Sequence, residues 1–165
     1  MNYEEAHSLE NTKQSQYSPC IIKDNETIAR ILLTPKHYDN GEILPAAFEQ
    51  VFSKNGMSVL RLEYYFSESL SKTIEQLETD EVTYIGYSAA KVADIRAIQL
   101  EGYSVFYLLD TATKDKIGHA DIFTIRLSID ECGLPKKAFK NYIRKRISEV
   151  FCALIIPEQD KYFQI

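Results

Sequence analysis

The chain has 165 residues, of which 45% are hydrophobic and 26% are charged, and its formal net charge is −5. This composition is typical of one soluble globular domain, and it excludes a disordered chain. The sequence contains no run of about 18 consecutive apolar residues, which a membrane-spanning helix needs. The acidic balance disfavours nucleic-acid binding through overall positive charge.

Two features of the sequence indicate the cytoplasm. The first residues lack the basic and apolar regions of a secretory signal. The three cysteines, Cys20, Cys132 and Cys152, are odd in number and widely spaced, so they do not form the framework of a small secreted domain. Cys152 has apolar neighbours and is predicted to be a buried structural thiol.

The N-terminal third begins with a polar segment and continues with strands. Residues 1–19 lack apolar periodicity, which indicates a flexible tail or a lightly docked arm. The mostly apolar residues 27–33 predict a central strand. Residues 45–54 fit either a short helix or an irregular strand, and the alternation over 57–64 predicts another strand.

The middle of the chain predicts two helices that flank a strand. The first helix begins at Ser67 or Ser69 and runs to about Glu78, with an apolar stripe on one face. A strand follows over 82–87. Ser88 is a favourable N-cap, so a second helix is predicted over 89–99.

The last third predicts two strands and a long helix. The strands cover 103–110 and 119–127 and are expected to form an antiparallel hairpin with a long loop. Pro135 suits the first turn of a helix. Apolar residues then recur at three- and four-residue steps as far as Leu154, before Pro157 ends the helix.

This order of elements predicts an α+β fold with a mixed, largely antiparallel sheet and about three helices, including a basic amphipathic C-terminal helix. The strands do not alternate regularly with helices, which disfavours a parallel sheet. We expect a tail over residues 1–19 and a single domain over residues 20–165.

Familiar catalytic motifs are absent from the sequence. It has no Walker A loop, no dinucleotide-binding glycine motif, no nucleophile elbow and no zinc-protease motif. The sequence leaves the cofactor unknown, and no metal site is predicted.

The strongest candidate site lies on the strand that follows Gly118. His119 and Asp121 share one face of this strand, because side chains two residues apart point the same way. The pair either forms a pocket rim, where a carboxylate orients an imidazole, or closes the sheet as a partly exposed strand end.

Other candidates are basic or polar residues inside strand patterns. Arg30 interrupts an apolar strand, so it forms either a structural ion pair or a site for a phosphate or carboxylate. Arg61 and Ser58 are added to this anion-binding set, although Arg61 is expected to be exposed. His37, in the loop after the first strand, joins His119 and Asp121 as a catalytic candidate if the strands converge.

The C-terminal helix carries a cluster of basic residues. Over residues 136–149, six basic side chains against Glu149 give a local charge of +5. This face is either solvated or a docking surface for an acidic protein or RNA. Its residues are Lys136, Lys137, Lys140, Arg144 and Lys145.

Two functions are consistent with these patterns. The first is a small intracellular binding or accessory domain within a multi-protein assembly, with a protein partner. The alternative is a small enzyme that uses histidine and arginine on a nucleotide, RNA or other phosphate-bearing substrate. A homo-oligomer is left open, and a membrane partner is not expected.

Overall fold

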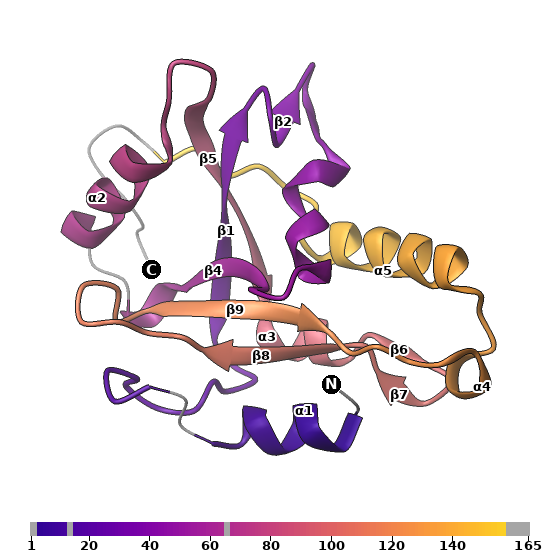
Figure 1. Ribbon diagram of the computed structural model, residues 1–165. Helices are drawn as coiled ribbons and strands as arrows, with labels where there is room; N and C mark the ends of the chain where they lie inside the picture. The colour runs from indigo at the N-terminus through magenta and orange to yellow at the C-terminus, as the bar shows by residue number, and fades with distance from the viewer. Residues whose placement is uncertain (1–2, 13–14, 65–66, 158–165) are drawn as a thin grey trace.

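The computed structural model describes residues 3–12, 15–64 and 67–157. Its centre is a five-stranded antiparallel sheet in the order β5-β1-β4-β9-β8 (Figure 1). The strands of this sheet are β1 (Thr27–Thr34), β4 (Met57–Arg61), β5 (Thr83–Lys91), β8 (Phe106–Asp110) and β9 (His119–Thr124).

Helices and two small ribbons surround the sheet. The α-helices are α1 (Tyr3–Glu10), α2 (Ser67–Leu77), α3 (Val92–Arg96), α4 (Ile129–Cys132) and α5 (Lys136–Val150). The 3-10 helices are η1 (Pro45–Ala47), η2 (Glu49–Phe52) and η3 (Leu62–Tyr64). The ribbons pair β2 (Tyr38–Asp39) with β3 (Glu42–Ile43), and β6 (Gln99–Leu100) with β7 (Tyr103–Ser104).

The predicted α+β class, with its largely antiparallel sheet, is confirmed. Within the described residues, α1, α2 and α5 are the helices of seven or more residues. None of the helices in this part of the chain has the length and apolar character needed to cross a bilayer.

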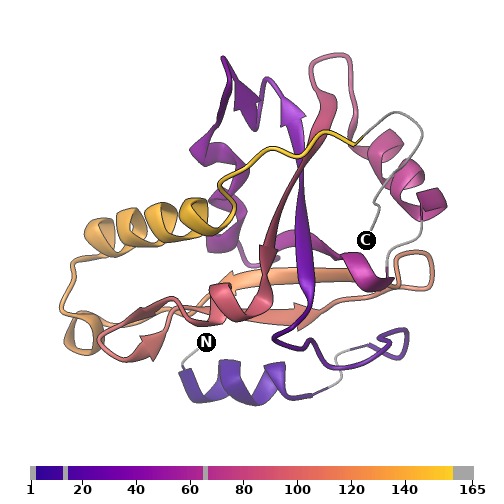
Figure 2. The same cartoon turned by 180° about the vertical axis from the view of Figure 1, so that it is seen from behind.

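The sheet opens between β1 and β4. Strand β1 pairs with β5 along its whole length, but it pairs with β4 only through Ile28–Arg61 and Ala29–Leu60. In Figures 1 and 2, β1 and β5 run steeply across the direction of β4, β9 and β8. The second half of β1 therefore stands away from β4, and this separation positions the candidate site.

Most of the core lies on one face of the sheet. Apolar residues of β1, β4 and β9 pack there against η1, η2, α3 and α5, and Phe48 contacts Phe151 at a ring-centroid distance of 5.8 Å. A smaller cluster, which includes Leu33, Leu60 and Leu70, lies beneath α2. Burial of these apolar surfaces is the main stabilising contribution to the fold.

The predicted helix over 89–99 is mostly wrong. Strand β5 continues to Lys91, with Ser88 buried opposite Arg30, and α3 begins only at Val92. Continuous pairing with β1 satisfies the backbone of Ser88, Ala89 and Ala90, and it overrides the local helix preference of the alanines.

Other predicted boundaries were too long. The strand predicted over 57–64 ends at Arg61 and continues as η3, and the strand predicted over 119–127 ends at Thr124. The strand predicted over 103–110 is divided at Val105 into β7 and β8. The ambiguous segment 45–54 forms the two short 3-10 helices η1 and η2.

The C-terminal helix begins as predicted but ends at Val150. Phe151 already leaves helical geometry, with φ −101° and ψ 53°. As a result Cys152 is exposed, and its predicted burial is wrong.

Helix α1 lies within the segment predicted to be a flexible tail or docked arm. It packs along β8, where Ala6 is fully buried and the Glu10 carboxylate accepts a hydrogen bond from the Leu108 amide at 2.9 Å (Figure 1). At the opposite edge of the sheet, the Ile155 backbone exchanges two hydrogen bonds with Tyr87 of β5. The two segments therefore cover part of each outer strand.

Candidate functional site

A cavity of about 190 Å3 lies beside the opening between β1 and β4. Its polar lining includes Arg30, Lys36, His37, Ser58, Lys116 and His119, and we call it the Arg30 pocket. The sequence left open whether Arg30, His37 and His119 converge; the structure places all three in this one cavity.

Arg30 reaches across the opening of the sheet. Its side chain donates to the backbone oxygens of Ala47 at 3.1 Å and Ser58 at 2.9 Å, and to the Gln50 amide oxygen at 3.0 Å. All three acceptors are neutral, and a guanidinium carries five N–H groups. Two of its N–H groups therefore have no partner among the described residues.

The charge of Arg30 is poorly compensated. The side chain is 7% exposed and forms no ion pair with a described carboxylate. Burial lowers the pKa of Arg30 to about 10, and the charge of Asp121 opposes this only in part. The predicted structural ion pair is therefore absent from the described residues.

His37 is held over the end of β1 by the backbone. Its amide donates to the Leu33 oxygen at 2.6 Å, and its ring Nδ1 accepts a hydrogen bond from the Leu33 amide at 3.3 Å. Burial, together with the positive charges of Arg30 and Lys36, lowers the pKa of His37 to about 4. The ring is therefore neutral at pH 7, with its proton on Nε2.

His119 and Asp121 are connected through Thr111. The Thr111 hydroxyl lies 2.6 Å from Asp121 Oδ2 and 2.8 Å from His119 Nδ1, whereas the direct distance from His119 Nδ1 to Asp121 Oδ2 is 3.8 Å. A carboxylate can only accept, so the hydroxyl proton goes to Asp121 and Nδ1–H of His119 donates to the hydroxyl oxygen. This assigns the lone pair of the neutral ring to Nε2.

Burial and the charge of Lys116 lower the pKa of His119, while the carboxylate of Asp121 acts in the opposite direction. The Asp121 carboxylate also accepts a hydrogen bond from the Ser58 hydroxyl at 2.9 Å. The predicted orientation of an imidazole by a carboxylate is thus indirect.

Thr111 is a site residue that the sequence reasoning missed. It follows β8 directly, and the pairing of β8 with β9 places Asp110 opposite Ala120. The Thr111 amide donates to the His119 oxygen at 3.2 Å, which continues this pairing by one residue. The predicted hairpin, extended past Asp110, was the signal that could have identified Thr111.

The expected exposure of Arg61 is wrong, because its side chain is 0% exposed. Its guanidinium binds both oxygens of Glu26, at 2.6 and 2.7 Å, and also the Asp110 carboxylate. The remaining N–H groups donate to the backbone oxygen of Cys20 at 3.0 Å and to its sulfur at 3.3 Å.

We call Arg61, Glu26, Asp110 and Cys20 the Arg61 cluster. Burial alone would lower the pKa of Arg61, but the hydrogen bonds to Glu26 and Cys20 and the two carboxylate charges raise it. Because all five N–H groups are used, Arg61 has no donor left for an anion, and it does not line the Arg30 pocket.

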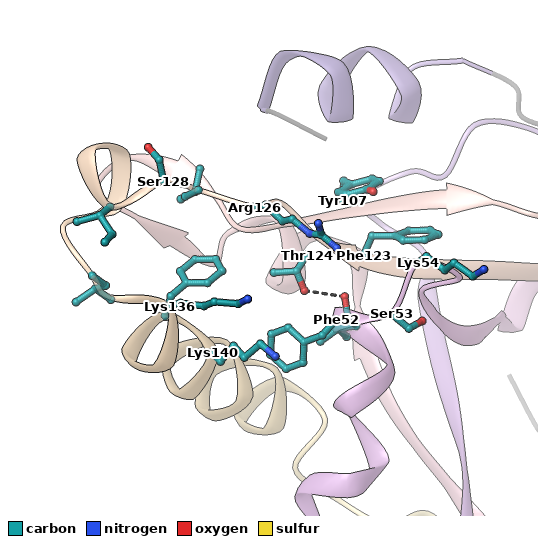
Figure 3. Close-up of a pocket in the computed structure, with 15 residues that line it drawn as sticks. Phe52, Ser53, Lys54, Tyr107, Phe123, Thr124, Arg126, Ser128, Lys136 and Lys140 are labelled. Atoms are coloured by element: carbon teal, nitrogen blue, oxygen red, sulfur yellow. Dashed lines mark hydrogen bonds between the residues drawn. The ribbon is translucent and has the colours of Figure 1, made fainter.

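The basic residues of α5 have different surroundings. Lys137 and Lys145 are exposed, and Arg144 forms an ion pair with Glu49. Lys136 and Lys140 line a second and larger cavity beside α5 (Figure 3). The predicted docking set is therefore divided between an open surface and a cavity.

Within the described parts of the chain, no three histidine, cysteine or acidic side chains gather as a metal site would require. No model of a known protein family matches the chain, and neither a curated protein nor a solved structure matches it.

Proposed function

We propose that this chain binds a small phosphate-bearing anion in the Arg30 pocket. The observation that carries the proposal is the buried guanidinium of Arg30, which has only neutral partners and two N–H groups without a described acceptor. A buried charge without a counter-ion is costly, and an anionic ligand would offset that cost. The paired N–H groups of a guanidinium also suit phosphate oxygens.

The rest of the pocket supports an anionic ligand. Lys36 and Lys116 add two positive charges to the lining, and the described lining residues include no carboxylate. The volume of about 190 Å3 is smaller than that of most drug-sized ligand pockets. It therefore suits a small phosphate ester, or the phosphate end of a larger ligand.

Acid–base chemistry on that ligand is the enzymatic form of this proposal. The neutral ring of His119 offers a lone pair on Nε2, and His37 offers a proton on Nε2. His119 would act as the general base that takes a proton from an attacking water, and His37 would donate a hydrogen bond to the bound anion. The water oxygen forms a new P–O bond, the P–O bond to the leaving group breaks, and the leaving oxygen takes a proton from solvent. A phosphate diester is the substrate class that fits this set, since its cleavage needs proton transfer and charge stabilisation.

The test is calorimetric titration with inorganic phosphate and with a phosphate monoester. Arg30→Gln should weaken binding at least tenfold, whereas Arg146→Gln, the same change at a half-buried arginine of α5 that is paired with Glu149, should leave it unchanged. Because Arg30→Gln can also disturb folding, Lys36→Gln with Lys116→Gln provides a second variant at the rim. This rim variant should also weaken phosphate binding. The proposal fails if phosphate does not bind to the wild type, or if the rim variant binds phosphate as tightly as the wild type does.

Hydrolysis of a chromogenic phosphate diester tests the enzymatic form separately. His119→Gln should abolish turnover while phosphate binding remains within about threefold of the wild type. If this variant turns over the diester at the wild-type rate, His119 is not the general base. The proposal is then limited to anion binding in the Arg30 pocket.

An accessory role within a protein assembly is the second candidate, and we assign either role to the cytoplasm. All three cysteines are free, which supports a reducing compartment. Exposed Ile129 and Ile156, at 61% and 67%, favour contact with a partner. Charge reversal of Lys137 and Lys145 should remove a co-purifying partner if the basic face is the docking surface, and unchanged co-purification would contradict this.

A further inference from the structure

The cavity beside α5 has a volume of about 650 Å3, compared with about 190 Å3 for the Arg30 pocket. It lies between η2, the ends of β8 and β9, the segment that leads to α4, and the first turns of α5 (Figure 3). We call it the α5 groove. Its volume falls within the range of pockets that bind small organic ligands, and it shares no lining residue with the Arg30 pocket.

The charged side chains that line the α5 groove among the described residues are all positive. They are Lys54, Arg126, Lys136 and Lys140, and the described lining contains no aspartate or glutamate. None of these four forms an ion pair with a described carboxylate. The hydrogen bond from Arg144 lowers the pKa of Glu49, and the charge of Lys140 adds to this. The Glu49 carboxylate is bound by Arg144 and forms no ion pair with Lys140.

Such a concentration of positive side chains in one cavity is unusual for a chain whose net charge is −5. Figure 3 shows Lys136 and Lys140 extending from α5 toward the side where Arg126 and Thr124 lie. Cations from both walls therefore face the same space. Such an arrangement concentrates positive potential in a partly enclosed cavity and favours a ligand with more than one negative charge.

Aromatic rings form much of the apolar lining. Tyr107 and Phe123 stack with centroids 5.1 Å apart and an interplanar angle of 14°. Phe139 and Phe52 line the α5 side, and Lys140 Nζ lies 5.2 Å from the Phe52 ring centroid. Tyr107 and Phe139 are buried, so the half-buried rings of Phe123 and Phe52 are the ones that can contact a planar ligand. The contact of Lys140 with Phe52 holds the lysine charge at the groove.

We propose that the α5 groove binds a free nucleoside phosphate, with its base against the aromatic rings and its phosphate between Lys136, Lys140 and Arg126. A monocarboxylate would match only one of four cations, whereas a phosphate carries up to two charges and a polyphosphate carries more. A purely aliphatic anion would not use the aromatic faces. The combination of a planar ring and multiple negative charges is the chemistry of a nucleotide.

The groove also indicates how selective this binding is. The hydroxyl of Thr124 donates to the Val51 oxygen at 2.8 Å, and that of Ser53 donates to the Gly56 oxygen at 3.3 Å. The Ser128 hydroxyl is engaged by Glu131 at 2.8 Å. Because these three hydroxyl groups already bond within the chain, they are not available to distinguish base edges, and stacking tolerates any base. Purine and pyrimidine nucleotides should therefore bind with similar affinity.

The experiment is an NMR titration of the full chain with AMP, adenosine, inorganic phosphate and a five-nucleotide single strand. AMP should bind at least tenfold more tightly than adenosine or phosphate, and it should shift the resonances of groove residues. The double variant Lys136→Gln, Lys140→Gln should weaken AMP binding at least tenfold. The matched control Lys137→Gln, Lys145→Gln, which makes the same charge change outside the groove, should bind AMP as the wild type does.

Several results would overturn the proposal. These are no AMP binding, equal binding of phosphate and AMP, or equal effects of the two double variants. A strand that binds more than tenfold tighter than AMP would instead identify nucleic acid, not a free nucleotide, as the ligand. Arg30→Gln separates the two cavities, since it should remove phosphate binding at the Arg30 pocket and leave AMP in the α5 groove.

Discussion

Arg61 and Arg30 are two buried arginines on adjacent strands, and their surroundings are opposite. Arg61 uses all five N–H groups and binds two carboxylates, whereas Arg30 is bound by three neutral oxygens. Accordingly the pKa of Arg61 is raised, and that of Arg30 is lowered to about 10. Burial of an arginine does not by itself indicate its role; compensation of its charge does.

The Arg61 cluster also connects distant parts of the chain. Arg61 lies on β4, and its hydrogen bonds to Glu26 and Cys20 link β4 to the segment before β1. Its ion pair with Asp110 links β4 to the end of β8. The Arg30 pocket, by contrast, lies where β1 and β4 do not pair. Arg61 therefore links separate segments of the fold, whereas Arg30 lines a cavity beside the opening between β1 and β4.

The largest expected effect comes from Arg61→Met. Removing the cation leaves Glu26 and Asp110 as buried carboxylates without their counter-ion, which costs about 3–5 kcal/mol. Urea unfolding at pH 7 should show this loss. Arg96→Met is the matched control, because the ion pairs of Arg96 with Glu10 and Asp24 are partly exposed, and it should cost about 1 kcal/mol or less. Equal losses for the two variants would contradict a structural role specific to Arg61.

The second effect is a loss of stability in acid that comes from His37. Its pKa is about 4 in the folded chain against an ordinary value of 6.5, so between these values the unfolded chain binds more protons. The free energy of unfolding is therefore unaffected by His37 above pH 6.5. It decreases as the pH falls toward 4, because the unfolded chain is stabilised by protonation of this ring. The loss is about 3 kcal/mol.

His37→Gln should remove that pH-dependent part while other acid-labile groups remain. The measurement is the free energy of unfolding in urea at half-unit steps from pH 7 to pH 4. If the curves of wild type and variant run parallel, His37 is not held neutral by its burial and by the positive charges of Arg30 and Lys36, and the contrast with the compensated Arg61 cluster weakens.

Much of the fold was predictable because it depends on local patterns. The strand over 27–33 and the start of the helix at Lys136 are both marked by apolar spacing and a nearby proline. What failed depended on distant partners. Ser88 to Ala90 join a strand because β1 lies beside them, and the partners of Arg61 are 35 and 49 residues away.

The candidate site was partly predictable for the same reason. Polar residues inside strand patterns identified Arg30 and the His119–Asp121 pair, since burial makes such residues conspicuous. Thr111 and the α5 groove were missed. A threonine is common after a strand, and the spacing of Phe139 fits the apolar face of a helix that packs on the core. The sequence alone therefore does not identify either residue as part of a site.

The third prediction tests the uncompensated charge directly. Arg30→Met removes a buried cation but leaves the Ala47 and Ser58 oxygens without this donor, so we expect a loss of about 1–3 kcal/mol, smaller than that of Arg61→Met. Added phosphate should raise the melting temperature of the wild type and not that of Arg30→Met. If phosphate raises the melting temperature of both proteins, the anion binds at a site other than the Arg30 pocket.

The smallest effect concerns Thr111 and the proton on His119. Thr111→Val keeps the shape but removes a hydroxyl that donates to Asp121 and accepts from His119, which should cost about 1 kcal/mol. Nitrogen chemical shifts of the His119 ring should show the proton on Nδ1 in the wild type and a mixture of tautomers in Thr111→Val. Thr111→Ser should restore the wild-type tautomer, because it restores the hydroxyl. An unchanged tautomer in Thr111→Val would mean that Asp121 fixes the proton on His119 Nδ1 without the hydroxyl, by the direct contact that is 3.8 Å long in the wild type.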